Sequence, residues 1–286
     1  MTDVELSRRE VLRSGVLGSA AVVAGCLGDG SGSTTTAPGT DSAGPISAVS
    51  VDGSDLVVEL VENHDVSGVN LIGPDGSAFA ETKIPVGETT TRIELLDIRP
   101  GVGGYEHYEP GLYELVAVGG SGSSKMEVAL EPDLRITAVE QYREGERPAD
   151  YGKLAVSVEN AGTGPTWVYD ITYDDAPNFA ANNELVSGAG VPQLTVPDNL
   201  VEAVIGPQNQ RQYVGTTTPL QFGQESGASC EDRTTFSVIV GAPIGNPLEA
   251  RVSVRMRGES RPVGLVDQYT CTEVEVMDLS VGGIDA

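Results

Sequence analysis

The chain contains two histidines, and imidazole is the side chain best suited to metal binding and to acid–base chemistry near neutral pH. His64 lies in Glu62-Asn63-His64-Asp65, and His107 lies in Gly104-Tyr105-Glu106-His107-Tyr108-Glu109. Both segments have the composition of loops between strands. The two imidazoles together with a carboxylate are candidate metal ligands, and a second candidate is a recognition loop made of Tyr105, Glu106, His107 and Tyr108. A solvated loop is the alternative for each segment.

The residue sets of other catalytic and cofactor sites are missing from the sequence. No serine lies in a Gly-x-Ser-x-Gly elbow, and no Gly-x-Gly-x-x-Gly or P-loop pattern follows a strand. A blue-copper site fails because both histidines precede Cys230 and none follows it. The acidic and amide residues from Asp174 to Glu184 offer oxygen ligands, but their spacing matches no calcium loop. We expect no cofactor and no catalytic residue, so a non-catalytic role is favoured, although the sequence does not decide whether the protein is an enzyme.

The first 26 residues have the pattern of an export signal. Ser7-Arg8-Arg9-Glu10-Val11-Leu12-Arg13 carries the twin arginines Arg8 and Arg9, and the apolar segment 15–25 follows. Eleven residues are too few for a membrane-spanning helix, which needs about 20. Residues 1–25 therefore form the predicted signal peptide. The adjoining Val23-Ala24-Gly25-Cys26 resembles a lipobox, which predicts lipidation at Cys26, and cleavage with release of the chain is the alternative.

Residues 26–45 are predicted to be the lipidated cysteine and a flexible tether, because Gly, Ser, Thr, Pro and Asp dominate this stretch. With Cys26 taken by the lipid, Cys230 and Cys271 remain as an even pair in an oxidising compartment. We expect a disulfide between them, with two free buried thiols as the alternative.

The charge of the chain excludes several partners. The formal net charge is −25, from 42 acidic and 17 basic residues, and lysine occurs only three times. Nucleic acids and anionic membrane faces both require a basic footprint, so neither is an expected ligand. Such a charge repels itself strongly in dilute buffer but is screened at molar salt. Acidic composition together with a twin-arginine lipoprotein signal resembles the exported lipoproteins of halophilic archaea.

From residue 46 onward, short runs of alternating apolar residues recur at intervals of about ten and predict an all-β protein. We expect one β-sandwich domain over 46–132 and a second over 133–286, with a long loop insertion at 174–199. Solute-binding lipoproteins alternate strands and helices, and this chain lacks the helices. On the strands at 248–257 and 273–277 we expect arginines to meet glutamates across the sheet. The alternative is that this basic strip docks another acidic surface.

Two local patterns resemble immunoglobulin-like sandwiches. Tyr113 follows Pro110-Gly111 at a strand start, as in the tyrosine corner, whose hydroxyl bonds a nearby backbone group. Asn160-Ala161-Gly162-Thr163-Gly164-Pro165 is similar to the N-x-G-x-x-P loop of the cell-surface modules called CARDB-like. These resemblances imply two immunoglobulin-like β-sandwich domains.

The expected function is that of an extracytoplasmic lipoprotein, anchored by lipid to the outer face of the cytoplasmic membrane. There it would bind a cell-surface protein or polysaccharide in an adhesion or scaffolding role. The alternatives are an accessory or hydrolytic domain acting on a surface polymer, and a metal-binding surface protein.

Overall fold

The computed structural model describes residues 44–98, 106–143, 150–185, 193–264 and 267–281, all within one compact unit. Over these residues the chain is all-β and its sheets are antiparallel, with three short 3-10 turns and no α-helix. None of the described helices is long and apolar enough to cross a membrane. The all-β prediction is confirmed, whereas the division at residue 132 and the immunoglobulin-like topology stay predictions.

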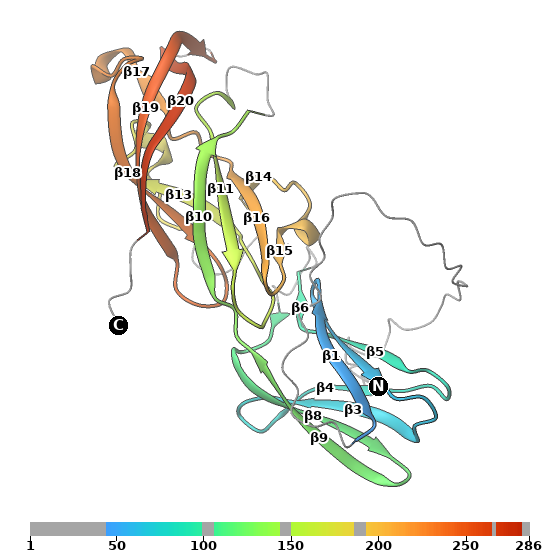
Figure 1. The fold of residues 1–286 in the computed structure, drawn as a ribbon. Helices are drawn as coiled ribbons and strands as arrows, with labels where there is room; N and C mark the ends of the chain where they lie inside the picture. Colours follow the sequence, from blue (N-terminus) through green and yellow to red (C-terminus); the bar gives the residue numbers. More distant parts are fainter. Residues whose placement is uncertain (1–43, 99–105, 144–149, 186–192, 265–266, 282–286) are drawn as a thin grey trace, which may run out of the picture. The chain divides into compact units, whose positions relative to one another are not determined.

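Residues 46–130 form two main antiparallel sheets around the first core (Figure 1). Their strand orders are β1-β2-β5 and β4-β3-β8-β9, and β6 and β7 form a separate two-stranded ribbon. The strands are β1 (Ile46–Asp52), β2 (Asp55–Leu60), β3 (Val66–Ile72), β4 (Ala78–Lys83), β5 (Thr90–Glu94), β6 (Leu96–Asp97), β7 (Glu106–His107), β8 (Gly111–Gly119) and β9 (Gly122–Leu130).

The first core follows from the period-two pattern of these strands. Leu56, Val58 and Leu60 on β2 are buried and face Leu71 and Leu115 from the other sheet, so alternate side chains fill one interior. The same core includes side chains that come much later in the chain: Trp167, Tyr169, Ala203, Val204 and Ile244.

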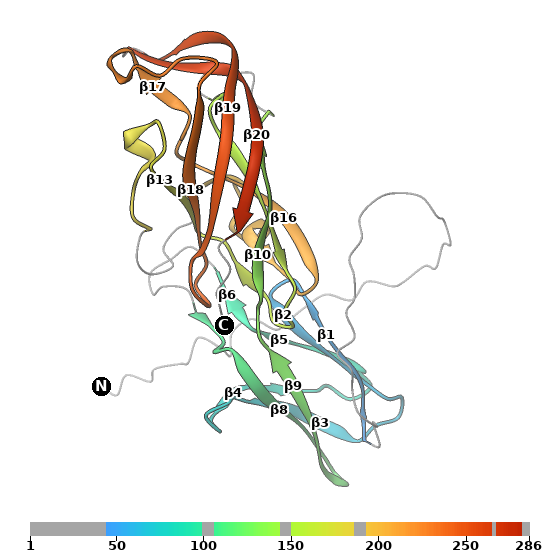
Figure 2. The same ribbon diagram turned by 60° about the vertical axis from the view of Figure 1, so that its left-hand side comes forward.

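Residues 134–281 form a second pair of sheets, with strand orders β10-β11-β16-β14 and β13-β18-β19-β20-β17, and β12 pairs with β15 as a ribbon. The strands are β10 (Leu134–Gln141), β11 (Leu154–Asn160), β12 (Thr166–Trp167), β13 (Asp170–Asp174), β14 (Leu194–Val196), β15 (Val204–Ile205), β16 (Asn209–Gly215), β17 (Gln221–Gly223), β18 (Arg233–Gly241), β19 (Leu248–Val263) and β20 (Gln268–Val281). The 3-10 turns are η3 (Phe179–Ala181), η4 (Leu200–Ala203) and η5 (Gln224–Ser226). Strands β10 and β20 belong to different sheets but lie side by side in both views (Figures 1 and 2).

The predicted arginine–glutamate pairing between β19 and β20 is confirmed. Arg255 lies opposite Glu275, and Arg257 Nε is 3.1 Å from the Glu275 carboxylate. Val252 and Val254 on the opposite face of β19 are buried. Because the pair is exposed, it contributes at most about 1 kcal/mol and acts mainly to neutralise the sheet surface.

Two local expectations were wrong. Period-two alternation over residues 153–159 predicts that Ala155 and Ser157 point to solvent, but both are buried on β11, a central strand that pairs with β10 and β16. The apolar residues of 201–205 predict a strand from Val201, but the segment begins as η4, because the Asn199 side chain accepts a hydrogen bond from the Val201 N–H and caps the turn.

Candidate functional site

His64 lies in the loop between β2 and β3, and both of its ring nitrogens contact backbone groups. Nε2 is 2.9 Å from the Glu88 carbonyl oxygen, and the Val66 N–H donates to Nδ1 at 3.1 Å. A carbonyl oxygen can only accept, so Nε2 is the donor in the contact with Glu88. A metal ion would have to displace one of these bonds, and the ring therefore serves to hold two loops together.

Tyr108 is buried, whereas the neighbouring His107 is exposed and its ring contacts two nearby groups. The His107 Nδ1–H donates to the Tyr108 carbonyl oxygen at 2.9 Å, and its ring packs edge-on against Trp167 at 6.0 Å. Tyr108 is fully buried, and its hydroxyl donates to the Pro165 carbonyl oxygen at 2.9 Å. Burial raises the pKa of Tyr108, because the phenolate would lose its solvation. Tyr108 therefore presents no surface of its own in this structure, and the recognition loop of Tyr105, Glu106, His107 and Tyr108 stays a prediction.

The other predicted site residues are divided between described and undescribed segments. Glu106 pairs through its backbone with Asp97, whereas Tyr105 lies outside the described residues, as do Arg8, Arg9 and Cys26. Within the described ranges no group of three or more His, Cys, Asp or Glu side chains is placed to hold a metal ion. The metal-site candidate of His64 and His107 is thus left without a third ligand among these residues.

Amide side chains in the polar loop after β13 close the loop on itself. Asn182 accepts from the Ala176 N–H at 2.9 Å and donates to the Ala176 carbonyl oxygen. Asn178 caps η3 and donates to the Thr218 carbonyl oxygen at 2.7 Å. The amide groups of Asn178 and Asn182 are thereby used in loop structure.

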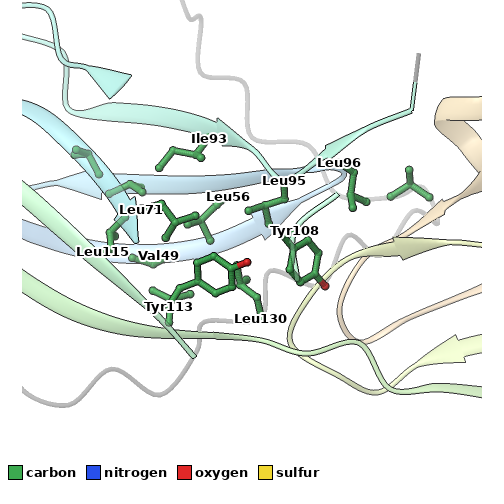
Figure 3. Packing of buried hydrophobic residues seen from close by; sticks show 14 of the residues in the cluster. Val49, Leu56, Leu71, Ile93, Leu95, Leu96, Tyr108, Tyr113, Leu115 and Leu130 are labelled. Atoms are coloured by element: carbon green, nitrogen blue, oxygen red, sulfur yellow. The ribbon is translucent and has the colours of Figure 1, made fainter. Parts of the chain in front are cut away.

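Tyr113 makes the predicted backbone contact. Its hydroxyl donates to the Glu109 carbonyl oxygen at 2.8 Å and accepts from the Glu109 N–H at 3.1 Å. The ring lies in the same core as Tyr108, with their centroids 6.3 Å apart (Figure 3). Burial is the main cause that raises the pKa of Tyr113. These hydrogen bonds hold the start of β8 against the preceding loop.

The predicted disulfide is present. Cys230 and Cys271 are bonded, with their Cα atoms 5.6 Å apart and a sequence separation of 41. The bond joins the turn before β18 to β20 within the second core. The thiols are therefore not available as nucleophiles or as metal ligands.

An open groove of about 410 Å³ lies along the end of β10. This volume lies in the usual range for small-ligand sites, about 300–1,000 Å³. The lining comes from four strands and the segment that follows β10: Val139, Glu140, Gln141, Tyr142, Arg143, Ala155, Gln212, Val274 and Val276. Sequence reasoning missed it, because lining residues such as Gln141 and Val274 are 133 positions apart.

Gln141 fixes the geometry of this groove. Its amide nitrogen donates to the Thr272 carbonyl oxygen at 3.2 Å and to the Tyr151 carbonyl oxygen at 2.9 Å. Its amide oxygen accepts from the Val274 N–H at 3.1 Å. One side chain thus closes the gap between two sheets by pairing with the exposed edge of β20.

Comparison with known proteins gives no family assignment. No family model matches the sequence, and no curated protein matches it. Among solved structures, a β-glucuronidase from glycoside hydrolase family 2 aligns with 72% of this chain and 19% of that chain, at 13% identity and a TM-score of 0.23. The similarity is weak and confined to part of that enzyme, so it does not establish a common architecture.

Proposed function

We propose that the protein is a lipoprotein of the outer face of the cytoplasmic membrane, where it acts as a non-catalytic binding, scaffolding or adhesion module. The disulfide Cys230–Cys271 is the observation that carries the proposal. Disulfides persist in oxidising compartments, so a cross-link within the folded body supports export. The twin arginines and the single remaining cysteine, Cys26, supply the route and the anchor.

The surface features of the body support binding rather than hydrolysis. Glycosidic-bond hydrolysis uses two carboxyl groups, about 5–9.5 Å apart across the bond. The groove lining contains one carboxylate, Glu140. The two histidines contact backbone groups, and the cysteines of the described body are oxidised. Surface recognition requires neither a pair of carboxylates nor a free imidazole or thiol.

Cell fractionation tests the anchoring. We expect the full chain in the membrane fraction, soluble only in detergent, and the Cys26→Ser variant in the medium or the soluble fraction. Replacing Arg8 and Arg9 by lysine should retain the protein inside the cell. Cys230→Ala is the matched control, since it also removes a cysteine but should leave the protein at the membrane. Wild-type protein in the cytoplasmic fraction would contradict the proposal.

Crosslinking in high salt, followed by identification of the linked molecules, tests the binding role. We expect the same envelope component in repeated experiments with the wild-type protein and its loss in the released Cys26→Ser variant. A protein that yields no reproducible surface partner would contradict a scaffolding or adhesion role while leaving the anchoring intact.

A further inference from the structure

Strand β9 is an open edge of the first pair of sheets. Its only hydrogen-bonded neighbour is β8, and no other described strand lies along it (Figure 1). The two-residue turn Gly120-Ser121 makes Gly119 and Gly122 a hydrogen-bonded pair. The alternation of an antiparallel ladder then directs the N–H and C=O groups of the odd-numbered residues in 123–129 away from β8. Within the described residues these groups have no hydrogen-bond partner.

The other edge strands of the described sheets are protected against pairing with a further strand, as edges of natural sheets usually are. The pairings of β1, β4 and β10 are each interrupted by a register shift. The Gln141 side chain bonds the edge of β20, and the remaining edge strands have at most five residues. In contrast, β9 pairs with β8 along all nine of its residues without a register shift, and it contains no proline.

The charges on this edge are complementary to those of a second copy. Because β9 runs from residue 122 to residue 130, two copies that pair antiparallel over the full strand are related by a two-fold axis at Met126. Lys125 of each copy then lies opposite Glu127 of the other. In this register odd-numbered residues face odd-numbered residues, so the outward N–H and C=O groups of the two strands can bond one another.

Neighbouring registers bring like charges together. An axis moved by one residue to Lys125 would place two lysines opposite each other, and an axis moved to Glu127 would place two glutamates opposite each other. Like charges in that position are destabilising. The sequence of β9 thus favours one register, and a strand without this order of charges is a poorer match.

Glu127 is available for an ion pair between copies. It lies opposite Glu114 on β8 and forms no ion pair within the described residues. Lys125 Nζ is 2.8 Å from the Glu114 carboxylate, and an ammonium group has two further N–H donors. The net charge of −25 makes two copies repel in dilute salt. At about 1 M salt the Debye length is about 3 Å, which screens this long-range repulsion more than it screens groups in contact.

We infer that two copies of this chain pair through β9 about a two-fold axis at Met126, which joins their four-stranded sheets into one continuous sheet. Main-chain hydrogen bonds supply the affinity, and the Lys125–Glu127 pairs set the register. The inference goes beyond the proposed anchoring and binding roles, neither of which requires a dimer.

Sedimentation equilibrium of the full chain with Cys26→Ser, in about 1 M KCl, tests the pairing. This substitution leaves no free thiol, because the other two cysteines are bonded to each other. We expect the mass to rise with concentration to that of a dimer and no further. Lys125→Glu should weaken pairing about tenfold, because two attractive cross-strand pairs become repulsive. Lys125→Glu combined with Glu127→Lys should restore it.

Lys83→Glu is the matched control for the charge change. Lys83 is exposed on β4, at the opposite edge of the same sheet, so this variant should pair like the wild type. Thermal melting at concentrations where the dimer is dissociated checks that each variant is folded.

A cysteine at the axis tests the register directly. The two Met126 residues form a non-hydrogen-bonded pair, with Cα atoms about 4.5 Å apart, which a disulfide can span. Met126→Cys in the Cys26→Ser chain should therefore give a covalent dimer on mild oxidation. Thr82→Cys, half-buried on β4, is the control and should give none.

Any of four results would overturn the inference: the mass of a monomer at every concentration up to about 1 mM, equal weakening in Lys83→Glu, no recovery in the double charge exchange, or no cross-link in Met126→Cys. A monomer would show that β9 stays unpaired or is covered by another part of the chain. Fractionation tests the anchoring separately, so a monomer retained at the membrane would lose the dimer and keep the proposed location.

Discussion

The Tyr108 hydroxyl donates a hydrogen bond to the Pro165 carbonyl oxygen across 57 positions of sequence, and both ends of the bond are buried. The loop that ends at Pro165 is also fastened to the segment after β9, because the Thr163 and Gly164 N–H groups donate to the Glu131 carbonyl oxygen. A Cβ atom added at Gly164 would overlap the Tyr108 hydroxyl. Glycine is therefore required here by close approach, and the loop identified by its N-x-G-x-x-P pattern acts as a packing element.

Tyr108→Phe should lower the free energy of unfolding by about 1–2 kcal/mol, because the Pro165 carbonyl oxygen is left buried without its donor. Gly164→Ala should be more damaging in the wild type than in the Tyr108→Phe background, where the overlapping hydroxyl is gone. Urea unfolding of the two single variants and the double variant measures this coupling. Additive losses would contradict the close approach of the two residues.

Removing the hydroxyl of two other buried tyrosines, Tyr213 and Tyr173, should change the free energy of unfolding in opposite directions. The Tyr213 hydroxyl donates to the Ala203 carbonyl oxygen at 3.0 Å, whereas the Tyr173 hydroxyl is buried without a partner among the described groups. Tyr213→Phe should cost about 1 kcal/mol, and Tyr173→Phe should stabilise the protein by about 1 kcal/mol, since an unsatisfied buried hydroxyl is costly. Each variant is the control for the other in the same urea titration. A destabilised Tyr173→Phe variant would count against this assignment.

The role of Tyr113 could be predicted from the sequence, whereas the burial of Tyr108 could not. Tyr113 follows Pro-Gly at a strand start and bonds a residue four positions away, so its role depends on local sequence. Tyr108 lies among acids and aromatics in a segment with the composition of a loop, and its hydroxyl packs against Gly164 and bonds Pro165, which lies 57 positions away in the sequence. Local patterns cannot show such long-range packing.

The same reasoning applies to the strands and the groove. Val252, Val254 and Met256 alternate with Ser253, Arg255 and Arg257, and period two alone predicts which face is buried. The groove depends on Gln141 reaching Thr272, 131 positions away, and no periodicity encodes that contact. Core faces and the disulfide could thus be predicted, whereas the candidate binding site could not.

Alkaline pH should destabilise the protein through its buried tyrosines. Burial raises the pKa of Tyr108, Tyr173 and Tyr213 in the folded state above the ordinary value of about 10. The folded state therefore holds these protons more tightly than the unfolded state does. The stabilisation is complete below about pH 10 and falls above it, by up to about 1.4 kcal/mol per pH unit for each residue.

Urea unfolding between about pH 9 and pH 12 measures this decline, and Tyr173→Phe should make it shallower by removing one of the three groups. Phenolate absorbance of the folded protein provides a second readout. If all nine tyrosines titrated together near pH 10, the buried positions of these rings would be wrong.

Removing the disulfide should cost about 4 kcal/mol, the loop entropy expected for a cross-link that spans 41 positions. The double variant Cys230→Ala and Cys271→Ala is preferable to serine, because Cys271 is buried and a hydroxyl there would add its own cost. Thermal melting of this variant, with and without reductant, measures the effect. Reductant should lower the melting temperature of the wild type and leave that of the variant unchanged.

Salt should stabilise the protein, because repulsion among its carboxylates outweighs its surface ion pairs. The chain has 42 acidic and 17 basic residues, and exposed pairs such as Arg257–Glu275 contribute at most about 1 kcal/mol each. The Debye length falls from about 10 Å at 0.1 M to about 3 Å at 1 M, so salt weakens both the repulsion and the ion pairs. Because the repulsion is the larger of the two, its loss stabilises the folded state. We expect the melting temperature to rise by at least about 5 °C between 0.1 M and 2 M KCl. Chloride is preferable to sulfate, which stabilises proteins by its exclusion from their surface.

Glu127 gives this prediction a local test. It is exposed on β9 directly opposite Glu114 on β8, and like charges in that position are destabilising. Lys125 already pairs with Glu114 at 2.8 Å, so Glu114 has one cation and one like charge beside it. Glu127→Lys should raise the melting temperature at 0.1 M KCl, and its advantage should shrink at 2 M, whereas Glu127→Gln should give a smaller gain with the same trend. A gain that persisted unchanged at high salt would show that packing, rather than charge, governs this face of the sheet.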